Sequence, residues 1–222
     1  MKRSLFLFLP FSLLILLMAA CDGDDYVYPS VKLEFLTAAT DSRGSLQTVT
    51  TDEGLVYEVL TDGSGLSITA DSTARIVAYY EELTDDDGSL EGVKLYSATR
   101  AVAPNPKTAD EYEDGVVTKP AAVRSIWLGY NYLNIVLTAK QQGTHTIGFV
   151  ERSVEDEDGE RSIDILLYHD TDSDVEDYTK TAYLSIPLLS YLTSDVDVLY
   201  IDFSLYTDED ELRTYSFSYS AR

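Results

Sequence analysis

The alternate aspartates Asp170, Asp172 and Asp174 have the clearest spacing for metal chemistry. Alternate carboxylates can converge on one calcium ion, as they do in the first half of an EF-hand loop. The second half of that loop is missing, because Val175 stands where a glycine is needed and Thr181 where a glutamate is needed. We expect a solvated acidic loop, with weak calcium binding as the alternative, and no cofactor.

Side chains suited to acid, base or nucleophilic catalysis are scarce. His145 and His169 are the two histidines, and both continue an apolar alternation that could bring them face to face on paired strands. As metal ligands they would still need carboxylate or water partners. The sequence has no Gly-x-Ser-x-Gly nucleophile motif. We expect a protein that is not an enzyme. A hydrolase with two catalytic carboxylates remains open, because their separation depends on tertiary structure.

The 17 tyrosines are more than the core of a β-protein needs. Tyrosine suits binding surfaces, because it combines a large rigid ring with a hydroxyl. The alternative for each tyrosine is ordinary packing on a strand, with the hydroxyl at the rim. The candidate binding surface, for a glycan or a protein, consists of Trp127, Tyr130, Tyr132, Tyr215 and Tyr219, with Tyr79 and Tyr80 as further candidates.

The segments that must position these residues alternate apolar and polar side chains, which is typical of half-buried antiparallel strands. Asp62-Gly63, Asp87-Gly88 and Asp158-Gly159 supply the glycine that tight hairpin turns need. The sequence therefore predicts an all-β protein. The expected strands cover residues 31–35, 55–60, 75–83, 93–102, 123–128, 133–139, 145–151, 162–169, 182–188, 196–206 and 212–219.

Residues 103–120 interrupt this pattern with Pro104, Pro106 and Pro120 around a polar, acidic stretch. Proline cannot join the ladder of a central strand. We expect a small β-barrel domain at 31–103, a linker at 104–120 and an antiparallel β-sandwich domain at 121–222. The alternative is one continuous sandwich with a long surface loop.

The N-terminus has the layout of an export signal. Lys2 and Arg3 precede an apolar stretch at residues 5–20, which is shorter than a bilayer requires and contains a proline. Residues 17–21, Leu-Met-Ala-Ala-Cys, resemble the lipobox of bacterial lipoproteins, in which the cysteine carries the lipid. We expect a signal peptide at 1–20, lipidation at Cys21 and an acidic tether at 21–30. An ordinary secretion signal is the alternative.

Charge excludes one class of partner. The sequence has 39 acidic and 16 basic residues, a formal net charge of −23, and loss of residues 1–20 would bring it to −25. Such a surface repels nucleic acid and anionic headgroups. We therefore expect no nucleic-acid partner, and contact with the membrane only through the N-terminal lipid.

Several segments also carry a resemblance to a known family. These are residues 56–60, residues 75–80, and above all residues 125–135, which read Ser-Ile-Trp-Leu-Gly-Tyr-Asn-Tyr-Leu-Asn-Ile. Nearly the whole chain resembles the NigD-like lipoproteins of Bacteroidetes. The resemblance implies an OB-like barrel followed by a β-sandwich, and an envelope role of the bacteriocin-immunity kind. It provides no catalytic residues. Oligonucleotide binding, which an OB-like barrel suggests, is opposed by the acidic charge.

Together these observations predict an outer-membrane lipoprotein that acts by binding. The acidic residues directly after Cys21 resemble the export signal of surface lipoproteins in Bacteroidetes, so we expect exposure at the cell surface, or otherwise a protein that faces the periplasm. The first hypothesis is immunity-like capture of a cationic bacteriocin. The second is an adhesin-type module that binds a glycan or a surface protein, and the third is a carboxylate-dependent hydrolase.

Overall fold

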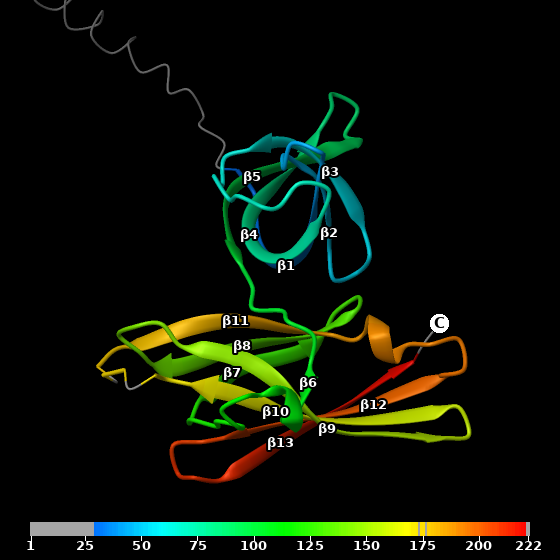
Figure 1. Ribbon diagram of the computed structural model, residues 1–222. Helices are drawn as coiled ribbons and strands as arrows, with labels where there is room; N and C mark the ends of the chain where they lie inside the picture. Colours follow the sequence, from blue (N-terminus) through cyan, green and yellow to red (C-terminus); the bar gives the residue numbers. More distant parts are fainter. Residues whose placement is uncertain (1–28, 173, 176, 221–222) are drawn as a thin grey trace, which may run out of the picture. The chain divides into compact units, whose positions relative to one another are not determined.

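The computed structural model describes residues 29–172, 174–175 and 177–220 (Figure 1). The predicted signal peptide, Cys21 and all but the last two residues of the predicted tether lie outside this range. Within the described range, no helix has the length and apolar character needed to cross a membrane.

The first five strands close into a barrel, as the sequence predicts. In the barrel the strands follow the order β1-β2-β3-β5-β4, and β1 pairs with β4 to complete the ring. The strand β2 is not among the predicted strands. The bounds are β1 Val31–Thr40, β2 Leu46–Thr50, β3 Val56–Asp62, β4 Thr73–Thr84 and β5 Leu90–Arg100.

Alternation along the strands explains the barrel core. Leu36 and Ala38 of β1 and Ile76 and Ala78 of β4 point inward and are fully buried, as is Tyr80. The candidate placement of Tyr80 on an exposed surface is therefore wrong, and the alternative of ordinary strand packing is confirmed, because the ring lies on the inward face of β4. Its hydroxyl donates to Glu34 at 2.8 Å.

Two of the three predicted glycine turns are confirmed. Gly88 and Gly159 both have positive φ and join antiparallel neighbours. The predicted hairpin at Asp62-Gly63 is wrong, because β3 pairs in parallel with β5 and not with β4. Gly63 instead donates its N–H to the carbonyl of Leu95 at 2.8 Å.

The remaining strands form two sheets around one core. The five-stranded sheet has the order β13-β12-β10-β9-β6, and the three-stranded sheet has the order β11-β8-β7. The bounds are β6 Lys107–Thr108, β7 Ala122–Leu128, β8 Tyr132–Lys140, β9 Thr146–Glu157, β10 Glu160–Asp170, β11 Thr179–Pro187, β12 Val198–Tyr206 and β13 Leu212–Ser220, with short 3-10 helices η1 Ala109–Glu111 and η2 Leu189–Tyr191.

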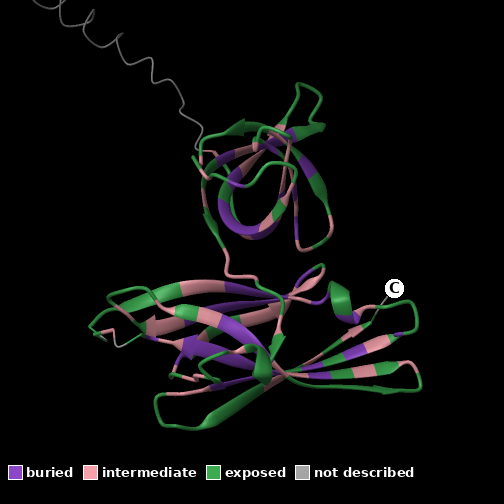
Figure 2. Cartoon of the chain, viewed as in Figure 1, coloured by how far each residue is buried: buried purple, intermediate pink, exposed green. Residues whose placement is uncertain are grey.

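The sandwich core is built from both sheets, with Ile135 and Ile186 from the three-stranded sheet against Phe149, Ile165 and Phe203 from the five-stranded one. The hairpin end of β9 and β10 is exposed, whereas the middle of β10 is buried (Figure 2). The two sheets and their shared core confirm the predicted β-sandwich.

Two features depart from the sequence-based expectations. The pairing of β10 with β12 is parallel, because the intervening β11 belongs to the other sheet and the chain must cross over and return. The segment 104–120, expected as a linker, contributes β6 to the five-stranded sheet, where it pairs in parallel with β9.

The three-stranded sheet buries both of its faces in part. Ile135 and Leu184 point into the sandwich core. Their neighbours on the opposite face, Asn134 and Ser185, are also fully buried although they are polar. A buried polar side chain needs a hydrogen-bonding partner. These two bond to each other and to Arg75 and Asp52 of the barrel, and together these residues form the site described next.

Candidate functional site

A buried ion pair lies at the centre of the site. The guanidinium of Arg75, on β4, contacts the carboxylate of Asp52. The side chains are 1% and 15% exposed, respectively. A buried charge needs both an opposite charge and hydrogen bonds that satisfy its remaining atoms.

The sandwich provides those hydrogen bonds. Arg75 Nη2 donates to Asn134 Oδ1 at 3.0 Å, and Arg75 Nε donates to Ser185 Oγ at 3.3 Å. Asn134 Nδ2 then donates to Asp52 Oδ2 at 2.7 Å, and Ser185 Oγ donates to Asn134 Oδ1 at 2.7 Å. On the barrel side, Arg75 Nη1 donates to Thr37 Oγ1 at 3.2 Å. The result is a connected polar network between barrel and sandwich strands.

The turn between β2 and β3 places Asp52. Thr51 Oγ1 accepts the N–H groups of Glu53 and Leu55, both at 3.3 Å, and the Thr51 N–H donates to the Leu55 carbonyl at 2.9 Å. Side chains of threonine often stabilise tight turns in this way. The turn therefore holds Asp52 in position to face Arg75.

Glycine is required where the chain between β7 and β8 passes this network. A Cβ atom on Gly129 would lie 2.7 Å from Asn134 Nδ2 and closer still to the Asp52 carboxylate. The Gly129 N–H donates to the Tyr132 carbonyl at 2.8 Å, which closes the turn. The Trp-Leu-Gly-Tyr-Asn-Tyr segment thus brings the sandwich close to the ion pair.

Aromatic rings enclose the network. The guanidinium of Arg75 lies 4.3 Å from the ring centre of Tyr132 and 5.5 Å from that of Phe35, within the range of cation–π contacts. Phe35 also makes edge-to-face contacts with Trp127 at 5.3 Å and Tyr183 at 5.8 Å between ring centres. These contacts join β1 and β4 of the barrel to β7, β8 and β11 of the sandwich.

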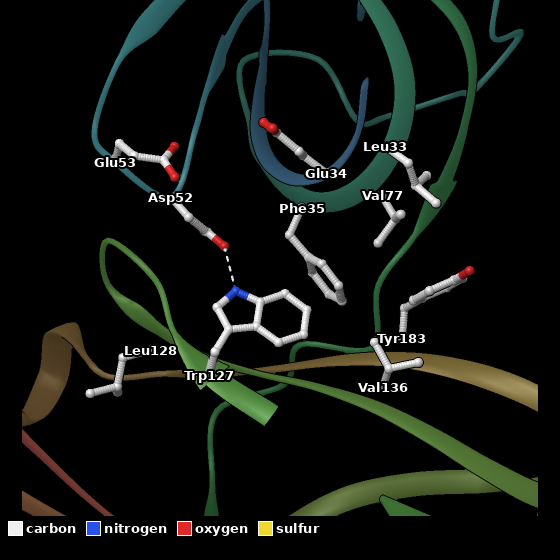
Figure 3. A pocket seen from close by; sticks show the side chains of 10 residues that line it. All are labelled: Leu33, Glu34, Phe35, Asp52, Glu53, Val77, Trp127, Leu128, Val136 and Tyr183. Carbon is white, nitrogen blue, oxygen red and sulfur yellow. Dashed lines mark hydrogen bonds between the residues drawn. The ribbon is translucent and has the colours of Figure 1, made fainter. Parts of the chain in front are cut away.

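A cavity of about 290 Å³ opens beside the network (Figure 3). We call it the acidic cavity. The indole N–H of Trp127 donates to Asp52 Oδ2 at 3.4 Å on its wall. The lining residues are Leu33, Glu34, Phe35, Asp52, Glu53, Val77, Trp127, Leu128, Val136 and Tyr183.

The lining of the acidic cavity has a simple chemical character. Most of it is aliphatic or aromatic, and its acidic residues are Glu34, Asp52 and Glu53. The Glu34 carboxylate is turned to the Tyr80 hydroxyl, and the Asp52 carboxylate is paired with Arg75. Neither lysine nor arginine is among the lining residues that the structure describes. Glu53 is exposed. Such a site can accept an apolar side chain with a positive charge beside it.

The structure separates the predicted binding residues into two groups. Trp127 lines the acidic cavity, Tyr132 stacks on Arg75, and the ring of Tyr130, whose residue is 51% exposed, lies beside Gly54. Tyr215 and Tyr219 lie on β13, in the other sheet, and pack against the sandwich core. Of the two further candidates, Tyr79 is 48% exposed and Tyr80 is buried.

The predicted acidic loop lies beside the two histidines. His145 Nδ1 lies 2.8 Å from His169 Nε2, and His145 Nε2 lies 3.1 Å from Asp174 Oδ2. The other ring nitrogen of His169 donates to the carbonyl of Lys119 at 2.9 Å. These contacts form a chain from Asp174 through His145 and His169 to the backbone of Lys119.

Asp174 therefore faces His145. Desolvation, the largest single influence, raises the pKa of the Asp174 carboxyl, but the N–H groups of Gln142 and Gly143 and the His145 ring together hold it below its ordinary value. Asp170 accepts the N–H of Asp172 at 3.0 Å. Among the residues described, no group of three histidine, cysteine or acidic side chains is placed to hold a metal.

Sequence reasoning did not identify the ion pair or its polar partners. Arg75 begins an apolar strand, and Asn134 and Ser185 each interrupt an apolar run. Asn134 and Ser185 lie on the face of the sheet opposite the core residues. A polar residue within an apolar run was therefore the sequence signal that this second face is also buried. The partner, Asp52, lies in a turn among many other acidic residues and gave no signal of its own.

Known structures share this architecture. A NigD-like immunity protein from Bacteroides caccae is 34% identical, with a TM-score of 0.73 over 89% of this chain and 100% of that one. A Bacteroides vulgatus protein of unknown function is 17% identical, with a TM-score of 0.64 over 86% of this chain and 91% of that one. A Bacteroides fragilis protein described as a candidate lipoprotein is 13% identical, with a TM-score of 0.56 over 87% and 99% of the two chains.

No curated protein matches the chain. Residues 104–219 match the family described as the NigD-like C-terminal beta sandwich domain. This match covers more than half of the sequence, and the Bacteroides caccae protein extends the likeness through the barrel. The chain therefore belongs to the NigD-like family.

Proposed function

We propose that this protein binds a cationic, partly apolar peptide or protein segment in the acidic cavity, as an immunity-type protein of the cell envelope. The observation that carries the proposal is the combination of apolar walls with the carboxylates of Glu53, which is exposed, and Asp52, which Arg75 also contacts. An apolar anchor that fills a pocket provides affinity, and the carboxylates favour a partner with lysine or arginine beside that anchor.

Two further observations support this role. The excess of acidic residues across the chain would attract a cationic partner before contact and speed association. The similar protein from Bacteroides caccae is described as a NigD-like immunity protein. Tyr215 and Tyr219 pack against the sandwich core, so the tyrosines give less support to a single glycan-binding surface.

The binding test uses a short synthetic peptide of alternating lysine and leucine, with a second peptide in which glutamate replaces each lysine. Calorimetry should show binding of the cationic peptide and none of the acidic one. Glu53→Gln removes an exposed charge from the cavity and should weaken binding about threefold to tenfold. Glu155→Gln makes the same charge change on β9, outside the cavity, and should leave affinity unchanged.

The apolar wall has its own test. Leu33→Ala shortens a lining side chain of a residue that is 47% exposed, so stability should change little while peptide affinity falls about tenfold. Leu90→Ala is the matched control, because Leu90 is also 47% exposed but does not line the cavity. Equal affinity of the two variants would argue against binding at this site.

We also propose that Cys21 carries a lipid that holds the protein at the outer membrane. The lipobox-like residues 17–21 support this, and a protein of the same fold from Bacteroides fragilis is described as a candidate lipoprotein. Cells fed labelled palmitate should yield labelled protein, and the Cys21→Ser variant should lose the label. Protease treatment of intact cells then separates the surface position, where the protein is digested, from the periplasmic one, where it is protected until lysis.

A further inference from the structure

A second cavity, of about 410 Å³, also has a residue of the buried network, Arg75, in its lining. We call it the arginine cavity. Its lining includes Arg75 and Arg100 with the polar side chains of Thr73 and Asn105 and the ring of Tyr132. None of the lining residues described is acidic, in a chain that has 39 acidic and only 16 basic residues. The volume is within the range of about 300–1,000 Å³ that is typical of small-molecule sites.

Each cavity is lined by one member of the ion pair. Asp52 lines the acidic cavity but not the arginine cavity, and Arg75 lines the arginine cavity but not the acidic one. The two charges contact each other between them. Because these two charges balance each other, the difference in charge between the cavities comes from Glu53 in the first and Arg100 in the second.

Arg100 adds a charge that no carboxylate balances. It lies on β5 opposite Ile76 of β4, so its side chain leaves the barrel wall on the opposite face from that of Arg75. Its Nη2 donates to the carbonyl of Ser67 at 2.8 Å, which fixes the side chain without neutralising it. Within the described part of the chain, Arg100 forms no ion pair. An arginine held in this way has further N–H donors free to bind a carboxylate through two parallel hydrogen bonds.

We infer that the arginine cavity binds a small organic carboxylate. Arg100 binds the carboxylate, and Thr73 and Asn105, which also line the cavity, bond to hydroxyl groups of the same molecule. Asp52 already balances the charge of Arg75, so Arg100 provides the positive charge of the site. The inference is independent of the proposed function, because it uses a different cavity and a ligand of opposite charge.

The test is an NMR titration of residues 29–222, which include the barrel and sandwich strands, with glucuronate and with glucose. The two sugars share a ring and hydroxyl groups, and only glucuronate has a carboxylate. Glucuronate should shift the amide signals of residues 73–75 and 100–105 and bind at least tenfold more tightly than glucose. Equal affinity for both sugars, or no shift at these residues with glucuronate or with acetate, would overturn the inference.

A pair of variants connects the shifts to Arg100. Arg100→Gln should weaken glucuronate binding at least tenfold, while Arg124→Gln, an exposed arginine on β7 that does not line the cavity, should bind like the unmodified protein. Thermal unfolding of both variants shows whether the fold is retained. A folded Arg100→Gln variant with unchanged affinity would also overturn the inference.

Discussion

Arg75 and Asp52 show how one residue pair shapes this protein. The guanidinium is satisfied by Thr37 from the barrel and by Asn134 and Ser185 from the sandwich, while Asp52 also accepts a hydrogen bond from Trp127. Replacing either member of such a buried pair leaves the other charge without compensation. The pair therefore holds together the walls of both cavities.

Loss of the guanidinium should be costly for stability. Arg75→Met leaves the Asp52 carboxylate without its main partner and should lower the free energy of unfolding by roughly 3–5 kcal/mol. Arg152→Met is the control, because Arg152 pairs with Asp164 while both side chains are about one third exposed, and it should cost less than about 1 kcal/mol. Urea unfolding measures both. Similar decreases in the free energy of unfolding of the two variants would show that the buried Arg75 pair stabilises the fold no more than the exposed Arg152 pair does.

The Asp174 carboxylate should make stability depend on pH. Because its pKa is lower in the folded protein than its ordinary value, it stabilises the fold above that ordinary value and loses the effect as the pH falls through the folded pKa. Asp174→Asn should thus be less stable than the unmodified protein at pH 7, and the difference should shrink in acid. Asp172→Asn, outside the contact with His145, should show no such trend. A difference independent of pH would contradict this.

At the scale of elements, the turn between β7 and β8 and the turn between β2 and β3 meet at the network. The first contributes Gly129 and the second Asp52. The three-stranded sheet makes this meeting possible, because one of its faces lies in the sandwich core and the other presents Asn134 and Ser185 to the barrel strands.

Gly129 tests the fit of these turns. Gly129→Ala places a methyl group against Asp52 and Asn134 and should lower the free energy of unfolding by roughly 2–3 kcal/mol. Gly115→Ala is a useful comparison, because it imposes the cost of a positive φ of 81° but meets no atom within 4 Å. That cost is about 1–2 kcal/mol. Thermal unfolding of both variants should show Gly129→Ala as the less stable one.

Sequence patterns were informative about elements and poor at contacts between them. Period-two alternation located most of the strands, and the Asp-Gly pairs at 87–88 and 158–159 located two turns. The parallel pairing of β3 with β5 depends on how the barrel closes, which no local pattern contains. Trp127 was chosen for its chemistry and does line a cavity, but Phe35 and Val77 beside it looked like ordinary strand residues.

At the scale of the whole molecule, acidic and basic side chains are unevenly distributed. Acidic side chains dominate the sequence, yet the arginine cavity has no acidic lining residue among those described, and the acidic cavity has no basic one. We interpret the chain as a binding protein whose overall field favours cations while one local site favours carboxylates.

Fluorescence of Trp127, the single tryptophan, tests the central claim most directly, because this residue lines the acidic cavity. The lysine-leucine peptide is titrated at low salt and again at about 0.5 M salt, where charges are screened beyond a few ångströms. The account predicts a saturable change in Trp127 emission whose affinity falls about tenfold or more at high salt. No change in emission with the cationic peptide, or an affinity that salt leaves unaltered, would contradict it.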